Sequence, residues 1–434
     1  MKATVSVALA GWFFCSVAAA AQNQALPVPA KLTVADAEQI ALENNPRITI
    51  DRLQELVQRE GVREARSPEF PQAEASLTAV DAEDASRLTA GFLNNPTLYT
   101  RAAAGISASQ LITDFGRTHH LVKRAQYSEQ AQKSVLAATR EEIRLVVDRA
   151  FLQALIQQRL LRIAEQTVTA RQSLDDEITT LTRAKLKSTL DQSIADSELS
   201  VAELNLVDAR TEAGNAMLDL NEILGITGEA NETLVDGEEN LQMPLALDAQ
   251  QLLATAYANR PDLAALLDEE SSAEQLKMAE RDLAKPTVQA MASAGNAPVR
   301  SDGITKEWYG AAGINVNIPL LNGSRFAVRS REAELAAMQA HARVTERRQQ
   351  IERDLRKTLQ SAQAAYQKIA VTEQLLEQAD LALQLASTRY RLGLSNIVEL
   401  NDAENAQIAA QIGAANARYV YRIWSAELRF QTGE

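Results

Sequence analysis

The chain has a single cysteine, Cys15, among its 434 residues. Residues 1–21 combine the positive Lys2, an apolar run and a small-residue site, which together predict a cleaved secretory signal peptide. Cys15 would leave with this peptide, so the mature chain would have no thiol for a disulfide or a thiolate metal site. Phe13 and Phe14 precede Cys15, whereas a lipoprotein cysteine needs small residues there, so we expect no lipid anchor.

The sequence also lacks an excess of basic residues, and it lacks long apolar runs after the signal peptide. The 44 Lys and Arg against 57 Asp and Glu give a formal net charge of −13. This balance argues against nucleic acid and against anionic lipid as partners. After the signal peptide, no segment reaches the ~18 consecutive apolar residues of a transmembrane helix. Any membrane span would therefore have to be built from strands.

Catalytic and phosphate-binding motifs are also lacking. The sequence contains no HExxH, no GxSxG and no phosphate-binding glycine loop. Its three histidines include the adjacent His119 and His120, which point roughly 100° apart on a helix and would not share a metal easily. We therefore expect no enzyme, no cofactor and no metal site.

Proline is absent between Pro96 and Pro244 and again after Pro319. In both tracts apolar residues recur every three or four positions, the period of an amphipathic helix. Examples are Ile143, Val147, Ala150 and Ala154 in the first tract and Ile351, Leu355, Leu359 and Ala362 in the second. One continuous helix over most of a tract would reach roughly 95 Å. Each tract therefore predicts a long antiparallel helical hairpin that turns near residues 182–188 or 391–396.

The chain also contains an internal duplication. Residues 32–48 align with residues 247–263 at an offset of 215, and from about residue 112 the offset becomes 208. The matched pairs include Pro46 and Pro261, Arg183 and Arg391, and Gly225 and Gly433. We expect two similar halves, residues 22–225 and 247–434, joined by a linker at 226–246 and arranged around a pseudo-symmetry axis.

Short segments ahead of each hairpin follow a period of two, which is typical of half-buried strands. They are residues 70–81, 99–111, 287–294 and 308–319, with polar loops expected at 82–97 and 295–307. Each strand is ~10 residues long, the length of a tilted membrane strand. Phe70, Tyr99, Trp308 and Tyr309 stand at strand starts, where an interfacial aromatic belt would place them. The alternation fits a small soluble sheet equally well.

Four strands per chain are too few for a closed barrel, since the smallest single-chain barrels have about eight. An open sheet in hydrocarbon would leave its edge N–H and C=O groups unpaired. If the strands are transmembrane, several copies of the chain must share one barrel. The expected fold is mainly α with a small β part: long antiparallel helical hairpins and four strands per chain.

Several motifs, in order along the duplicated chain, resemble those of the TolC-type outer-membrane efflux channels of Gram-negative bacteria. They are the paired openings ending in NNP and NRP, the strand exits LITDFGR (111–117) and PLLNGSR (319–325), and the segment RYRLGLSNIVELNDAENA (389–406). The resemblance covers essentially the whole mature chain. It implies a homotrimer with a twelve-stranded barrel in outer-membrane lipid and an α-barrel crossing the periplasm. It also implies a passive exit duct that docks to a periplasmic adaptor protein and an inner-membrane pump.

The resemblance further implies which residues form the gate. Acidic residues that narrow the periplasmic end match Glu399 and Asp402, which lie at i and i+3 on one helical face. Read from the sequence alone, the two are more simply solvated helix charges. A tyrosine–aspartate latch matches Tyr390 and Asp191. A second latch in the family uses an arginine two residues past the tip glycine, and this chain has Ser395 there instead.

The hairpin tips are the expected adaptor-docking surface. The residues concerned are Arg183, Lys185, Leu186, Arg391, Gly393, Leu394 and Ser395. Lys185 occupies the register of Gly393, where the family usually has glycine, so the first tip departs from the common pattern. One alternative function remains open, a periplasmic coiled-coil scaffold or adaptor without membrane strands. Such adaptors carry one helical hairpin between β-rich domains.

Overall fold

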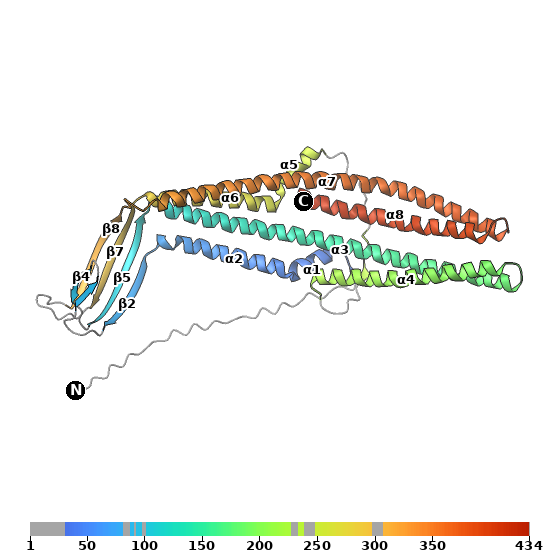
Figure 1. Ribbon diagram of the computed structural model, residues 1–434, viewed down its shortest axis with the longest axis horizontal. Helices are drawn as coiled ribbons and strands as arrows, with labels where there is room; N and C mark the ends of the chain where they lie inside the picture. Colours follow the sequence, from blue (N-terminus) through green and yellow to red (C-terminus); the bar gives the residue numbers. More distant parts are fainter. Residues whose placement is uncertain are drawn as a thin grey trace, which may run out of the picture.

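The computed structural model is an elongated molecule with a β-sheet at one end and the turns of two helical hairpins at the other (Figure 1). It describes residues 31–80, 87–90, 93–97, 101–226, 233–237, 248–296 and 307–433. The predicted signal peptide and Tyr99 lie outside these ranges. None of the described helices contains an apolar stretch long enough to cross a membrane.

Two successive sets of helices have equal lengths. The first set is α1 (Val34–Asn44), α2 (Pro46–Arg66), α3 (Arg117–Arg183) and α4 (Thr189–Leu224), and the second is α5 (Ala249–Asn259), α6 (Pro261–Arg281), α7 (Arg325–Arg391) and α8 (Ile397–Thr432). Matching helices have 11, 21, 67 and 36 residues in both halves. Single 3₁₀ turns, η1 (Ser67–Glu69) and η2 (Asp282–Ala284), follow α2 and α6. These equal lengths fit the duplication and its two offsets.

The hairpins turn where the sequence predicts. Each turn has one residue in the left-handed region, Lys185 with φ 63° in the first and Gly393 with φ 71° in the second. The returning helices begin at polar N-caps, because the Ser188 and Asn396 side chains accept from backbone N–H groups in the first turns of α4 and α8. Local sequence signals thus determine where the α3–α4 and α7–α8 hairpins turn and where their returning helices begin.

The repeated NNP and NRP motifs pack against the ends of the returning helices. Gly225 and Gly433 end α4 and α8 with φ of 69° and 76°. A Cβ at Gly225 would lie 3.3 Å from Asn44 Cβ, and one at Gly433 would lie 3.0 Å from the carbonyl carbon of Asn259. The glycines therefore provide both the left-handed cap and the space for the helix junction. This contact accounts for the presence of an Asn-X-Pro motif together with a helix-ending glycine in each half.

The largest apolar core lies at the middle of the molecule. It is built on Phe151 and Leu155 of α3, Leu220 and Leu224 of α4, and Ile40 of α1. Strand β1 (Lys31–Leu32) pairs in parallel with β6 (Thr233–Leu234), and both leucines join this core. β6 belongs to the predicted linker at 226–246, of which the structure describes residue 226 and residues 233–237.

The long helices run side by side along the molecule (Figure 1). Toward the sheet, α3 packs between α2 and α6, and α6 packs against α7. Toward the hairpin turns, α3 packs between α4 and α8, and α8 packs against α7. One edge of this helical array is therefore formed by α2 and α4, and the other edge by α7.

The sheet has four antiparallel strands in the order β2-β5-β7-β8. They are β2 (Gln72–Val80), β5 (Arg101–Thr113), β7 (Thr287–Asn296) and β8 (Trp308–Asn317). The predicted strands are confirmed to within a few residues at each end. A second pair, β3 (Arg87–Ala90) and β4 (Leu93–Thr97), lies inside the segment 82–97, so the prediction of a plain polar loop there was wrong. Among the residues that the structure describes, no strand pairs with the outer side of β2 or of β8.

Candidate functional site

The ends of both hairpins pack together in one small core. It contains Ile178, Ala195, Ala386, Tyr390, Ile397 and Leu400, which come from α3, α4, α7 and α8. Alanines in this core let the helices approach closely. The two turns are thus held side by side by apolar contacts between the hairpins as well as within each one.

Tyr390 is the largest side chain of this tip core and is only 4% exposed. The Nζ of Lys187, from the first turn, lies 3.7 Å from the centroid of its ring. Such a position allows a cation–π interaction. Within the described part of the chain, the Tyr390 hydroxyl has no hydrogen-bond partner. Burial, together with the negative charges of Asp191 and Glu177, raises the pKa of Tyr390 to about 12.

Asp191 makes a different contact from the one expected for a latch. Its carboxylate accepts from the backbone N–H of Ser188 at 3.2 Å, while its own N–H donates to the Ser188 hydroxyl at 3.1 Å. This reciprocal pair is a capping box that starts α4. The structure therefore brings Asp191 close enough to Tyr390 to affect its pKa, but the Asp191 carboxylate is engaged in the cap.

Glu399 and Asp402 are both exposed on the first turns of α8. Glu399 Oε1 lies 3.0 Å from Nε of Arg389, near the end of α7. This ion pair offsets part of the negative charge at the start of α8. Its exposure makes it weak, since solvent screens such pairs.

The tip surface is both apolar and basic. Four leucines there are 67–71% exposed: Leu186, Leu190, Leu392 and Leu394. Arg183, Lys185 and Arg391 are exposed beside them, whereas Ser395 is partly buried. The sequence reading missed Leu190 and Leu392, although apolar residues flanking a turn were a usable signal. A surface of this kind can bind a protein with apolar and acidic side chains.

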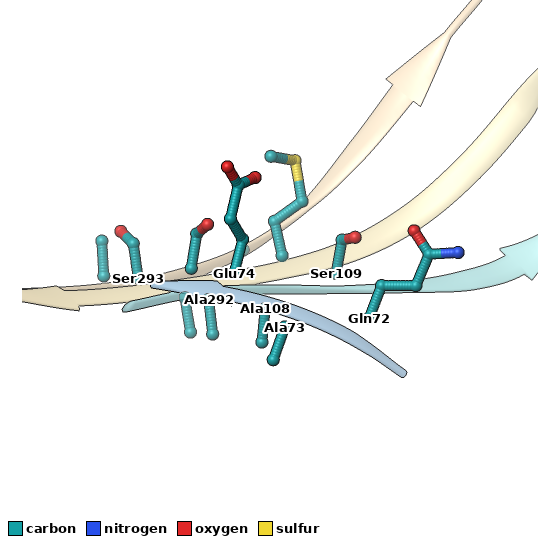
Figure 2. Close-up of a pocket in the computed structure, with 12 residues that line it drawn as sticks. Gln72, Ala73, Glu74, Ala108, Ser109, Ala292 and Ser293 are labelled. Atoms are coloured by element: carbon teal, nitrogen blue, oxygen red, sulfur yellow. The ribbon is translucent and has the colours of Figure 1, made fainter. Parts of the chain in front are cut away.

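The four-stranded sheet has one polar face and one apolar face. Figure 2 shows Gln72, Glu74, Ser109 and Ser293 on one side and Ala73, Ala108 and Ala292 on the other. The register continues this division, because directly paired residues share a face. The apolar face carries Leu77, Ile106, Trp308, Ile314 and Val316, all of them exposed in the single chain.

The predicted aromatic belt is distributed over both ends of the sheet. Phe70 precedes β2 at the helix end, and Trp308 begins β8 at the opposite end; both are largely exposed. Tyr309 differs from the expectation, because its pairing places it on the polar face. Its ring lies across Gly105 and Gly295, where an added Cβ would come within 2.6 Å of the hydroxyl oxygen. Glycines on the neighbouring strands thus make room for this ring.

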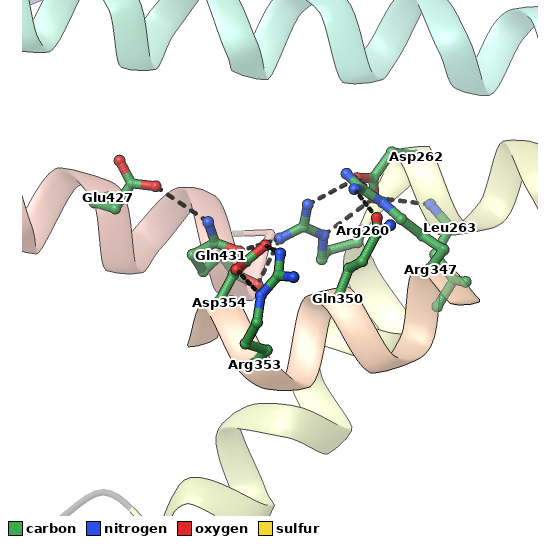
Figure 3. A network of polar contacts seen from close by, with 9 residues as sticks. All are labelled: Arg260, Asp262, Leu263, Arg347, Gln350, Arg353, Asp354, Glu427 and Gln431. Atoms are coloured by element: carbon green, nitrogen blue, oxygen red, sulfur yellow. Dashed lines mark hydrogen bonds and ion pairs between the residues drawn. The ribbon is translucent and has the colours of Figure 1, made fainter. Parts of the chain in front are cut away.

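A polar network fixes the α5–α6 junction to the end of α8 (Figure 3). Arg260 donates from Nη1 to the Gln431 side chain at 2.6 Å and from Nη2 to Asp262 at 2.7 Å. Arg347 of α7 also donates to Asp262. Burial alone would raise the pKa of Asp262, but the two arginines outweigh it and lower this pKa to about 2. The network thus holds the start of α6 against α7 and the end of α8.

No group of three or more histidine, cysteine or acidic residues in the described ranges could hold a metal ion. Two of the histidines have carboxylate or amide neighbours. His120 Nδ1 lies 2.9 Å from the Gln275 side chain, and His341 Nδ1 lies 2.8 Å from Glu270.

Known proteins resemble the chain over nearly its full length. The family model described as outer membrane efflux protein matches residues 38–226 and 252–434. The outer membrane efflux protein BepC of Brucella suis is 22% identical over 406 residues, which are 91% of this chain and 83% of BepC. The solved structure of VceC from Vibrio cholerae has a TM-score of 0.77 at 18% identity and covers 92% of this chain and 96% of its own. The CmeC channel of Campylobacter jejuni has a TM-score of 0.79 at 14% identity, covering 92% and 85%.

Proposed function

Because the chain belongs to the outer membrane efflux protein family, we propose that it is a passive exit channel of a tripartite efflux or type I secretion system. In this proposal its sheet lies in the outer membrane of a Gram-negative bacterium and its hairpins extend into the periplasm. Residues 1–21 act as a cleaved signal peptide, and the mature chain carries no lipid. The channel carries out no reaction and needs no cofactor.

The observation that carries the proposal is the two-faced sheet, whose two edges have no partner strand in the part of the chain that the structure describes. Leu77 is 87% exposed and Trp308 74% exposed on the apolar face of the sheet. Hydrocarbon would cover that face at low cost, whereas the free N–H and C=O groups of β2 and β8 need a partner strand. Three copies joined β8 to β2 would give a closed twelve-stranded barrel with the polar face inside.

The helical array supports the same assembly. Exposed apolar side chains follow its two edges. They are Ile50, Leu53, Leu56 and Val57 on α2, Val201, Leu204 and Val207 on α4, and Val328, Leu335, Met338, Val371, Leu375, Leu381 and Leu385 on α7. An apolar stripe on each outer helix is what side-by-side packing of identical copies requires. Three such arrays would enclose a helical tube that continues the barrel.

In the closed channel, Glu399 and Asp402 form two acidic rings at the periplasmic aperture. One turn of α8 separates them, so three copies would stack the rings along the pore. Rings of carboxylates attract cations and disfavour anions. Tyr390 and Asp191 form the gate latch. The Tyr390 ring supports this role, because it is buried in the core where the ends of both hairpins meet, and Asp191 lies in the first turn of α4 at that end.

The hairpin turns dock the periplasmic adaptor, which in turn links the channel to an inner-membrane pump. Exposed leucines beside arginine and lysine support a protein partner with acidic and apolar residues. Lys185 has a left-handed backbone conformation, which glycine would adopt at lower cost. A lysine at such a position supports a specific contact between its side chain and the adaptor.

A periplasmic scaffold without membrane strands is the competing function. The two hairpins of this chain and its apolar sheet face favour the channel instead. Fractionation distinguishes the two. We expect the protein to stay with the outer membrane through high-salt washes, to require detergent for release, and to form conducting pores in planar bilayers. Release by salt alone into a soluble, folded form would contradict the channel.

A further inference from the structure

Arg171 lies in α3, 12 residues before the helix ends at Arg183, or ~18 Å along the axis. Its side chain is 4% exposed. A buried guanidinium is stable only when its donors and its charge are matched. The sequence offers no motif that marks this position.

The partners of Arg171 come from two other helices. From α8, Asn401 accepts from Nη1 at 2.9 Å, Asn405 accepts from Nη2 at 2.9 Å, and Glu404 Oε2 lies 2.5 Å from Nη1. From α4, Glu198 Oε2 lies 3.4 Å from Nη2. The planar fork of arginine suits such a ring of oxygen acceptors. One side chain therefore ties the second hairpin to both helices of the first.

The duplication shows that the hairpins themselves do not need this arginine. At the offset of 208, Arg171 corresponds to Ala379, which is buried in the second hairpin. The α7–α8 hairpin forms with a methyl group at that position. Arg171 is thus particular to the seam between α3 and α8, where the two hairpins meet.

Asn401, Glu404 and Asn405 occupy one face of α8, at spacings of three and four. Glu399 and Asp402 lie roughly 100° or more around the same helix. Whatever holds the first face against α3 also fixes the direction in which the two acidic residues point. Contact with Arg171 therefore sets the geometry of the aperture.

On the basis of the proposed channel function, we propose that Arg171 is a positioning residue of the gate that clamps α8 to α3 in the closed tip. Outward movement of the α7–α8 hairpin would break the contacts with Asn401, Glu404 and Asn405. Glu198 of the first hairpin would remain beside the guanidinium, so its charge would keep a partner in both arrangements. The contact between α3 and α8 can therefore be closed or open, and in the open state the Arg171 guanidinium would still be paired with Glu198.

The test is single-channel conductance of the full-length protein in planar bilayers. The variants are Arg171→Gln, Arg171→Lys and the control Arg159→Gln, which changes an exposed arginine of the same helix. Losing charged hydrogen bonds should raise the ratio of open to closed channels by about tenfold or more in Arg171→Gln. Arg171→Lys keeps the charge but not the fork and should be intermediate. The control should match wild type.

A second variant keeps Arg171 and its acidic partners, Asn401→Ala with Asn405→Ala. It should also raise the ratio of open to closed channels. If Arg171→Gln fails to assemble, this double variant alone tests the clamp. A ratio of open to closed channels equal to that of wild type in this double variant, with assembly intact, would overturn the clamp. If the wild-type protein itself forms no pores, the proposed channel function fails instead.

Discussion

The Tyr390 side chain is held in the tip by its ring. The ring is buried among the four helices and faces Lys187, while its hydroxyl has no partner among the described residues. Removing the hydroxyl and removing the ring should therefore have different effects. Burial of the ring contributes several kcal/mol, about 3–5 for loss of a buried aromatic residue.

We expect Tyr390→Ala to open the tip and Tyr390→Phe to leave it nearly closed. The alanine variant loses core packing and the contact with Lys187, whereas phenylalanine keeps both. Leakage of large antibiotics into cells and single-channel conductance measure the difference. Equal conductance of Tyr390→Ala and wild type would remove Tyr390 from the gate, and a Phe variant as open as the Ala variant would assign the effect to the hydroxyl.

The acidic pair at the start of α8 should govern ion preference. Glu399→Gln with Asp402→Asn keeps the shape of both side chains but removes two charges per chain. Cation preference should fall and block by multivalent cations should weaken, because the rings no longer attract them. Reversal potentials in a salt gradient measure this, with Glu165→Gln, an exposed carboxylate on α3, as control. Unchanged reversal potentials would reduce the pair to solvated helix charges.

Single residues were the hardest to predict from the sequence. Glu399, Asp402, Asp191 and Tyr390 were found through a family resemblance and stay proposals. Arg171 and Lys187 were not found, because their partners lie about two hundred residues away along the chain, as Arg171 and Asn401 show. Side-chain pairing across that separation depends on how the hairpins meet, which no local pattern encodes.

The helices and strands were predicted well because their signals are local. Proline-free tracts with a helical period predicted both hairpins. The turn at Gly393 follows from the ease with which glycine adopts a positive φ. The β3–β4 pair was missed, since strands of four and five residues in a polar segment are too short to show a period. The face on which Tyr309 lies was not predicted, because an aromatic residue at a strand start does not reveal the register.

The first turn should tolerate glycine better than it tolerates lysine. A left-handed backbone at a residue with a Cβ costs roughly 1 kcal/mol, so Lys185→Gly should stabilise the α3–α4 turn by about that amount. The same change should weaken binding of the adaptor, which would lose a basic contact. Thermal unfolding and adaptor co-purification measure the two effects, with Gly393→Ala as the reverse change. Undiminished adaptor binding by Lys185→Gly would show that this side chain is not part of the docking surface.

The α5–α6 junction should be sensitive to acid. Arg260 and Arg347 lower the pKa of Asp262 to about 2 from an ordinary 3.8. A lowered carboxyl pKa gives stability that is present above the unfolded value and lost as the pH falls through the folded one. After solvent screening this is worth at most about 2 kcal/mol. Wild type should thus unfold at a higher temperature than Asp262→Asn at pH 6, and the gap should shrink between pH 4 and pH 2. A constant gap would mean that the ion pairs do not stabilise the junction.

At the scale of the whole molecule, a single chain leaves three surfaces incomplete. In the described ranges, both edges of the sheet are without a partner strand, one face of the sheet is apolar and exposed, and the outer helices carry apolar stripes. All three are satisfied together when copies stand side by side in a membrane. In the proposed assembly the tip and the gate would acquire their pore geometry only when several copies come together, so the residue and element predictions above depend on it.

Strand pairing between copies can be measured directly by disulfide crosslinking in outer membranes. Ala75→Cys on β2 is combined in turn with Gly310→Cys, Ala312→Cys or Ile314→Cys on β8. These residues share the apolar face but lie at opposite edges of the sheet. At least one pair should give covalent dimers and trimers on oxidation and none with either cysteine alone. A folded, membrane-bound protein that stays at the mass of one chain for every pair would contradict the shared barrel.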